Sequence, residues 1–161
     1  MKKIVFIIIF ITALTNNSFS AGSSNDSSDV KSNYTKAYNL IKSAKKYEKK
    51  GKTEKAQKRY AKAQKLLLLS NKEKPLQADT LNYLGFTTRK LGDYEAGEEF
   101  YLQGLQIDPN HNGINEYLGE LYVVTNRMDM AKGRLEVLKT CNCEEYNELK
   151  EIIEGNKKSK Y

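Results

Sequence analysis

Apolar and small residues recur at helical spacing in the middle of the chain. Residues 91–109, LGDYEAGEEFYLQGLQIDP, predict one helix that is closed by Pro109 and contains Gly97 and Gly104. Each interior glycine costs about 1 kcal/mol relative to alanine in a helix. Because these two lie two helical turns apart, they share one helix face. We therefore expect that face to make a tight helix–helix contact.

The same pattern recurs along the chain. The Leu-Gly pair at 84–85 returns at 118–119. This period, about 34 residues, is typical of repeat architectures built from helix pairs. Towards the N-terminus, the pair at 84–85 aligns with Ser43 and Ala44. The separation between these two units exceeds the repeat period by seven residues, which lie around 66–75. The extra residues predict either two further helical turns or a loop.

Several residues of the middle unit stand at the places of a known signature, namely Leu81, Leu84, Gly85, Gly92, Tyr94, Tyr101 and Pro109. The chain thereby resembles the tetratricopeptide repeat family, with units at 37–70, 78–111 and 112–145. Thr88, Gly97 and Gly104 depart from the family pattern. The resemblance implies an all-α solenoid of helix–turn–helix repeats over residues 34–155: three units and a C-terminal capping helix at 143–155.

Turn and cap residues fit this division. Three residues stand just after the first helix of each unit, where a left-handed conformation ends helices: Gly51, Gly92 and Asn126. Pro75 is expected to open the first helix of the second unit, and Asn110 to cap the third unit. Asn142 with Glu145 resembles a capping box for the last helix.

The N-terminus predicts export. A basic MKK is followed by the apolar stretch 4–14 and by small residues before Ala21, so residues 1–20 read as a cleavable signal peptide. The stretch is shorter than the roughly 18 apolar residues of a membrane span, and no membrane span is expected after cleavage. Residues 21–33 read as a flexible linker. The style of the signal favours a bacterial protein that is periplasmic or secreted.

Charge is divided unevenly. The chain has a formal net charge of +7. Residues 31–75 hold 15 Lys or Arg and 3 acids, whereas residues 76–155 hold 7 Lys or Arg and 15 acids. Residues 156–161 form a basic tail. Such asymmetry predicts an interaction surface, and export argues against nucleic acid as the partner.

Few residues suggest chemistry. His111 is the one histidine and is expected to be solvated in a turn, so neither a zinc set nor a catalytic triad can be assembled. The sequence predicts no enzyme, no cofactor and no metal site. Cys141 and Cys143, separated by a single residue, suit a local disulfide in an oxidising compartment. Free buried thiols, intermolecular bonding and soft-metal binding stay open.

The resemblance also implies where a partner binds, because first helices of successive repeats line a concave groove in this family. By that pattern the groove residues are Tyr38, Ile41, Lys45, Glu48, Lys49, Asp79, Asn82, Phe86, Arg89, Lys90, Glu116, Glu120, Val123 and Val124. Phe86 is expected to be exposed there, and Phe86, Arg89 and Lys45 to supply most of the binding energy.

The sequence therefore predicts an exported scaffold that binds a protein or peptide partner in its groove. A redox or soft-metal handling protein acting through Cys141 and Cys143 is the alternative. Self-association is a third interpretation, in which the basic unit of one copy meets the acidic units of another.

Overall fold

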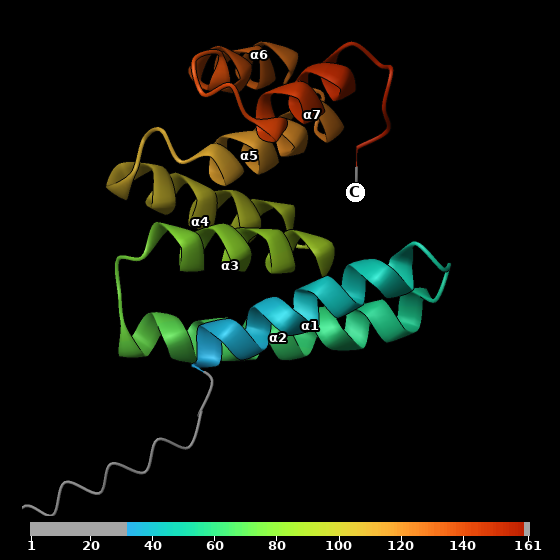
Figure 1. Ribbon diagram of the computed structural model, residues 1–161, viewed down its shortest axis with the longest axis vertical. Coiled ribbons are helices and arrows are strands. Elements are labelled where there is room, and N and C mark those ends of the chain that lie inside the picture. Colours follow the sequence, from blue (N-terminus) through green and yellow to red (C-terminus); the bar gives the residue numbers. More distant parts are fainter. Residues whose placement is uncertain (1–31, 160–161) are drawn as a thin grey trace, which may run out of the picture. The chain divides into compact units, whose positions relative to one another are not determined.

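The structure, a computed structural model, describes residues 32–159. The predicted signal peptide, nearly all of the predicted linker and the last two residues of the basic tail lie outside the described residues. The described part contains seven helices and no strand (Figure 1). Their bounds are α1 Asn33–Glu48, α2 Thr53–Glu73, α3 Ala78–Lys90, α4 Tyr94–Ile107, α5 Asn112–Val124, α6 Met128–Leu138 and α7 Glu144–Ile153. None of these seven helices is long and apolar enough to cross a membrane.

The helices stack as successive pairs. The most extensive contacts are α1 with α2, α3 with α4 and α5 with α6, and α7 packs on both α5 and α6. Figure 1 shows the pairs layered one upon another from α1–α2 to α5–α6, with α7 at the same end of the stack as α6. The fold is therefore an all-α helical repeat solenoid with a closing helix at its C-terminal end.

Glycines set the distance between paired helices, as their spacing predicted. A Cβ on Gly97 would lie 3.1 Å from the carbonyl oxygen of Gly85 and 3.2 Å from Cβ of Arg89. A Cβ on Gly104 would lie 3.5 Å from Cβ of Leu81 in the paired α3 and would collide with Ile114 of α5, the first helix of the next unit. Gly85 is tighter still, since an added Cβ would lie 2.5 Å from Cε1 of the buried Tyr101 ring. The expected tight helix contact is present.

The turn after each first helix also follows the prediction. Gly51, Gly92 and Asn126 have φ of 68°, 100° and 60°. This left-handed conformation is easily adopted by glycine and tolerated by asparagine. The first helix of each of the three repeats is therefore followed by one residue in the left-handed conformation.

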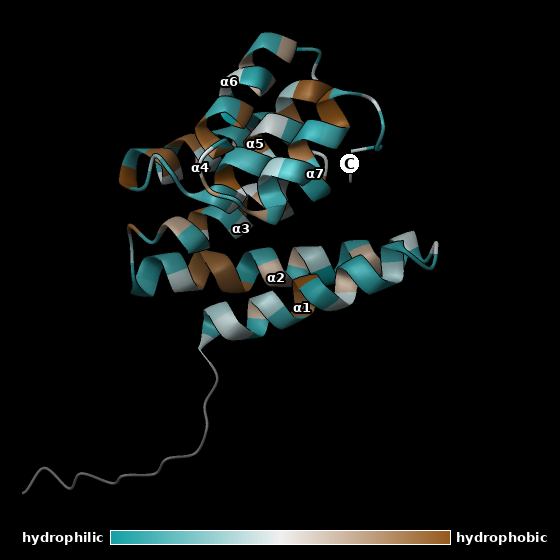
Figure 2. Cartoon of the chain, turned by 45° about the horizontal axis from the view of Figure 1, so that its top comes forward, coloured by the Kyte–Doolittle hydropathy of each residue, from teal (hydrophilic) through white to brown (hydrophobic). Residues whose placement is uncertain are grey.

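The extra residues of the first unit are helical. α2 has 21 residues, whereas α4 has 14, and the leucine run at 66–69 lies within α2. Leu67 is fully buried, but Leu68 and Leu69 are about half exposed. Figure 2 shows this apolar part as a brown band on an otherwise largely teal α1–α2 pair.

Three predicted helix starts are wrong. Leu76 has φ of 59°, so Pro75 precedes a turn, and α3 starts only at Ala78 with Gln77 as its N-cap. The backbone N–H of Asn110 donates to the side chain of Asp108, and α5 starts two residues later. Asn142 has φ of 48°, which is incompatible with the extended backbone of an N-cap residue.

Candidate functional site

An aromatic floor runs across the first helices of the three units. Tyr34 and Tyr38 of α1 lie 6.0 and 5.6 Å from the ring of Tyr83 in α3, measured between centroids. Phe86, one turn further along α3, lies 5.1 Å from Tyr117 of α5. Aromatic pairs at these separations stabilise a structure beyond the area they bury. The floor therefore ties units one, two and three together.

Phe86 belongs to this floor as a buried residue, which corrects the expectation that it is exposed. It is 1% exposed. The ring of Tyr60 meets it edge-on at 5.7 Å, and Nζ of Lys45 lies 4.5 Å above it. Lys45 also donates a hydrogen bond of 3.1 Å to the hydroxyl of Tyr117. Side chains from three helices thus cover Phe86, and only part of its ring borders open space.

Arg89 is equally buried and serves the packing between repeats. Its guanidinium donates to the backbone carbonyl of Tyr117 and lies 3.7 Å from the carboxylate of Glu120. The side chains of Arg89 and Glu120 are both 0% exposed. Removing one partner of a buried pair costs about 3–5 kcal/mol, because the other charge stays buried. Arg89 therefore holds α3 to α5 and is not an exposed anchor.

Above the floor lies a cavity of about 560 Å³ with walls of opposite charge. We define the basic wall as Lys45, Lys49 and Lys90. Phe86, Glu48, Glu144, Glu148 and Lys157 complete the lining of this cavity. Lys90 pairs with Glu48 at 2.6 Å, which holds its ammonium group against α1.

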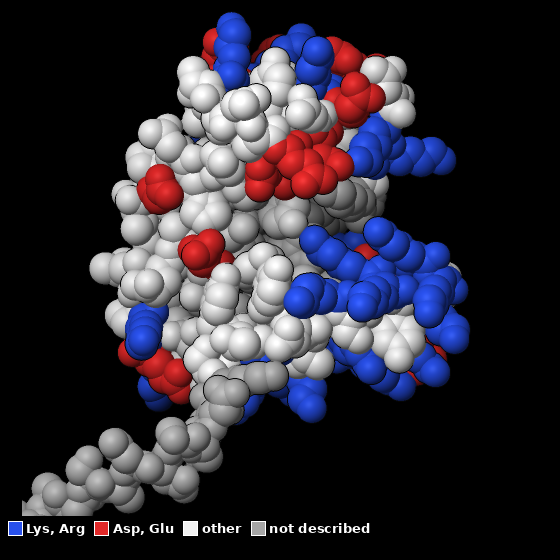
Figure 3. Space-filling model, in the orientation of Figure 1, with Lys and Arg blue, Asp and Glu red and all other residues white. Residues whose placement is uncertain are grey.

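The acidic wall faces the basic wall. We define it as Glu116 of α5 with Glu144, Glu145 and Glu148 of α7, which line a smaller hollow of about 200 Å³ with Tyr117. Figure 3 shows acidic side chains on one side of a depression and basic side chains across from them. We call the whole region, with its aromatic floor, basic wall and acidic wall, the groove.

The other predicted groove residues lie in different places in the structure. Ile41 is 1% exposed and belongs to the core, whereas Tyr38 is 38% exposed on the floor. Asn82 is buried and lines another hollow of about 480 Å³, together with Asp79 and Glu116. Two valines stand apart from these cavities: half-buried Val123 packs against the core, and Val124 is exposed. Of the residues expected to lead binding, Lys45 alone is accessible in the groove.

Burial changes the acidity of the floor tyrosines. Burial is the largest cause that raises the pKa of Tyr34 to about 12, and the nearby Asp79 carboxylate adds to it. Burial likewise raises the pKa of Tyr83 and of Tyr117. The pKa of Tyr60 rises through burial and through the hydrogen bond that its hydroxyl donates to Glu48. These hydroxyls stay protonated near neutral pH and act as hydrogen-bonding groups.

His111 is structural, contrary to the expectation of a solvated turn residue. Its side chain is 15% exposed, and Nδ1 accepts a hydrogen bond of 3.1 Å from the backbone N–H of Ile114. Nε2 lies 3.1 Å from the carboxylate of Asp79. His111 therefore caps α5 and ties it to α3.

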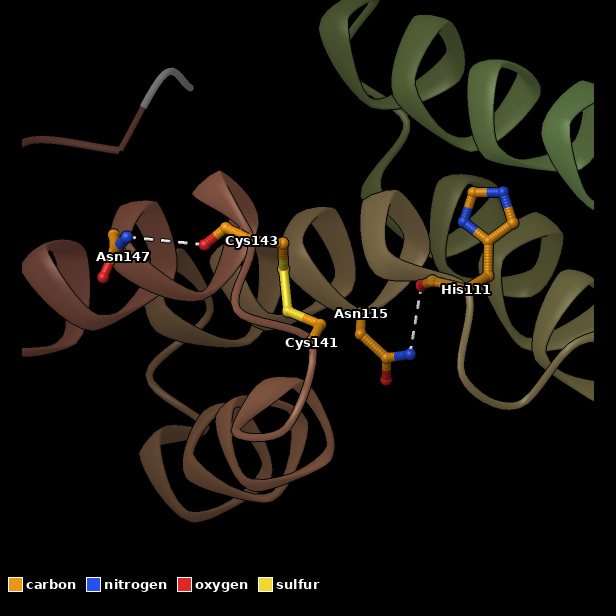
Figure 4. The surroundings of a disulfide bond; sticks show 5 residues. All are labelled: His111, Asn115, Cys141, Cys143 and Asn147. Carbon is orange, nitrogen blue, oxygen red and sulfur yellow. Dashed lines mark hydrogen bonds between the residues drawn. A yellow bond between two sulfur atoms is a disulfide. The ribbon is translucent and has the colours of Figure 1, made fainter.

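The cysteines form a disulfide between Cys141 and Cys143, with Cα atoms 5.2 Å apart. Figure 4 shows it in the segment joining α6 to α7, where Asn147 donates back to the carbonyl of Cys143. Among residues 32–159, no group of three or more histidine, cysteine or acidic side chains is arranged to hold a metal ion.

The groove also contains residues that were not predicted from the sequence, namely Tyr34, Tyr83, Tyr117, Glu144, Glu145, Glu148, Lys157 and Ser159. Tyr83 and Tyr117 are separated by one repeat period, so this period could have identified them as equivalent floor positions. Lys157 and Ser159 return to the groove from the tail: Ser159 donates a hydrogen bond of 3.1 Å to Glu120. No periodic signal marks these two residues, because they follow the last repeat.

The stacked helix pairs identify the chain as a helical repeat protein, and its charged groove lies across the first helices of the repeats. Residues 78–111 match the family model of the tetratricopeptide repeat, and they contain α3 and α4. The middle unit of the chain is therefore a tetratricopeptide repeat. No curated protein matches the chain by sequence.

One solved structure shares the fold, and two others show weaker similarity. The type III secretion translocator chaperone SycD of Yersinia enterocolitica is 17% identical, with a TM-score of 0.52 over 73% of this chain and 81% of that chain. The first tetratricopeptide domain of Spaghetti (RPAP3), bound to the HSP90 peptide SRMEEVD, is 20% identical, with a TM-score of 0.48 over 79% and 98%. A CopN–Scc3 complex is 20% identical, with a TM-score of 0.49 over 86% and 83%.

Proposed function

We propose that the protein is an exported interaction scaffold that binds a protein or peptide partner in the groove and performs no chemistry of its own. The observation that carries the proposal is the cavity of about 560 Å³ between the basic and acidic walls. Cavities of about 300–1,000 Å³ are typical binding sites. Export rests on the signal peptide expected at residues 1–20, and it places the partner in the periplasm or outside the cell.

The chemistry of the groove favours a polypeptide as the ligand. Lysines and carboxylates on facing walls suit a segment that carries both signs of charge, and such complementarity selects partners and speeds their association. Tyrosine hydroxyls and rings on the floor offer hydrogen bonds and apolar surface together. The fold is shared with a translocator chaperone, which supports a protein as the class of partner.

The test begins with peptides selected from a random displayed library on the immobilised chain from Ala21 onward. Lys49 is an exposed residue of the basic wall, and Lys65 is an exposed residue of α2 outside the groove. For the selected peptides, we expect Lys49→Glu to raise Kd about tenfold, because it places a like charge beside the ligand's acids. Lys65→Glu carries the same charge change and should leave Kd unchanged.

Fluorescence anisotropy of labelled peptides measures both variants beside the parent. Equal Kd for all three proteins, or a library that yields no peptide, would refute binding in the groove. Phe86→Ala and Arg89→Ala are unsuitable probes, since both residues are 1% exposed and their replacement disturbs the packing.

The redox or soft-metal alternative makes an opposite prediction for the disulfide. If Cys141 and Cys143 carry the function, replacing both by serine abolishes it. On the scaffold proposal the double variant binds the selected peptides with the Kd of the parent, because neither cysteine lines the groove cavity.

A further inference from the structure

The C-terminal segment turns back after α7. Gly155 has φ of 77°, which a residue with a side chain rarely adopts. The backbone N–H groups of Asn156 and Lys157 then both donate to the carbonyl of Glu151, at 2.9 and 3.1 Å. Figure 1 shows the chain looping beyond the end of α7 and returning toward the middle of the stack. Residues 155–159 comprise Gly155 and the described part of the basic tail, and we refer to them as the tail.

The tail is seated on the groove through two side chains. Nζ of Lys157 pairs with the carboxylate of Glu148, and Lys157 lines the groove cavity with Lys45 and Phe86. The hydroxyl of Ser159 donates to Glu120, the buried carboxylate that faces Arg89. The tail thus satisfies one carboxylate of the acidic wall and a second beneath it.

We propose that the tail occupies the acidic wall as an internal substitute for the partner, and that the partner displaces it with a short lysine-rich segment of its own. The inference rests on the proposed function and specifies the chemistry of its ligand. The tail shows which groups the partner segment needs: a lysine that pairs with Glu148 and, two residues later, a hydroxyl that donates to Glu120.

Charge decides which wall takes such a segment. The acidic wall gathers four carboxylates from α5 and α7, and the facing wall has three lysines. A cationic segment is therefore attracted to the α5–α7 side and repelled from the α1–α3 side. The C-terminal residues 156–161, NKKSKY, contain three lysines and no acid. The tail and the partner segment share this requirement, so they compete.

A tether makes the competition measurable. A short flexible linker gives an internal ligand an effective concentration in the millimolar range. If the free segment binds with Kd of about 0.1 mM, the internal tail weakens binding of an external segment about tenfold. Loosening the tail should therefore raise the external affinity by about that factor.

The probe is the labelled peptide GNKKSKY, which copies residues 155–161. It is titrated by fluorescence anisotropy into the chain from Ala21 and into two variants of it. Lys157→Ala with Ser159→Ala removes both tail contacts, and we expect about tenfold tighter peptide binding. Lys158→Ala changes the tail charge at a neighbouring, exposed residue and should leave Kd at the parent value.

Two further measurements fix the site. In the tail-loosened protein, Glu148→Gln should weaken binding of GNKKSKY severalfold. Exchanging the probe for GNAKAKY, which lacks the two contact side chains, should have the same effect. Thermal melting by circular dichroism checks that all variants fold, since every changed residue lies at the surface or is partly exposed.

Equal peptide affinity in parent and tail-loosened protein would overturn the inference, as would a peptide insensitive to Glu148→Gln. A parent that dimerises in sedimentation, through exchange of tails between copies, would also overturn it. If the library peptides bind with the expected dependence on Lys49 but GNKKSKY does not bind, the inference fails and the proposed function stands. If neither binds, both fail.

Discussion

Gly85 offers the sharpest test of how the helix pairs are packed. A Cβ added there would lie 2.5, 2.6 and 2.8 Å from Cε1, Cδ1 and Cζ of Tyr101. The ring is 0% exposed, so it has no room to retreat. Gly133, in the middle of α6, is the matched control, since a Cβ there would meet nothing within 4 Å.

Both changes to alanine gain about 1 kcal/mol of helix propensity. At Gly85 this gain is opposed by overpacking, which costs about 1–3 kcal/mol. We therefore expect Gly133→Ala to stabilise by about 1 kcal/mol and Gly85→Ala to be neutral or to destabilise by up to about 2 kcal/mol. The difference between the two variants, about 1–3 kcal/mol, isolates the packing cost.

Urea unfolding followed by circular dichroism measures this difference. With a slope of about 2 kcal/mol per molar, the midpoints of the two variants should differ by about 0.5–1.5 M. Tyr101→Leu added to Gly85→Ala makes room for the methyl group, so the two substitutions should cost less together than the sum of their separate costs. Equal midpoints for Gly85→Ala and Gly133→Ala, or strict additivity with Tyr101→Leu, would refute the close contact.

Two more expectations concern single side chains. His111→Ala removes the cap of α5 and its contact with Asp79, so we expect the free energy of unfolding measured in urea to fall by about 1 kcal/mol. His111→Asn can still cap the helix and should recover most of this loss. An equal loss in both variants would contradict a capping role. Alkaline titration tests the floor: the pKa of Tyr34 is raised from 10.0 to about 12, so its contribution to stability is complete below pH 10 and is lost as pH rises through 12. Circular dichroism should show helix loss between pH 10 and 12. The absorbance at 295 nm of the parent minus that of Tyr34→Phe should show that Tyr34 ionises later than an exposed tyrosine, and a normal titration in this difference would count against burial of its hydroxyl.

The parts of the fold that follow from local rules were predictable from sequence. Gly51, Gly92 and Asn126 end helices because of backbone conformation, which depends on the residue itself. Gly97 and Gly104 marked a close contact because they share one face of their helix, whereas Gly133 in α6 faces open space. The repeat period placed the helix pairs, and residues 78–111 match the repeat family.

The groove was less predictable because its exposure depends on residues far away in sequence. Phe86 and Arg89 stand on the face that the family pattern assigns to the groove, yet Tyr117 from the next repeat and Lys45 from the previous one cover Phe86. A repeat pattern gives the direction of a side chain and not what neighbouring units place over it. The return of Ser159 to Glu120, which is far away in sequence, likewise follows no local rule.

α7 has a double role with a consequence for dynamics. Leu149 fills the space beside Gly119, at 2.5 Å from the Cβ position that Gly119 lacks, while its neighbour Glu148 forms part of the acidic wall. Terminal elements open first in local unfolding, and their amides exchange fastest. A ligand that holds Glu148 therefore also holds the last helix of the stack in place. Occupancy of the groove should be readable as slower amide hydrogen exchange in α7 and in the part of α5 beneath it, even where the ligand touches neither backbone.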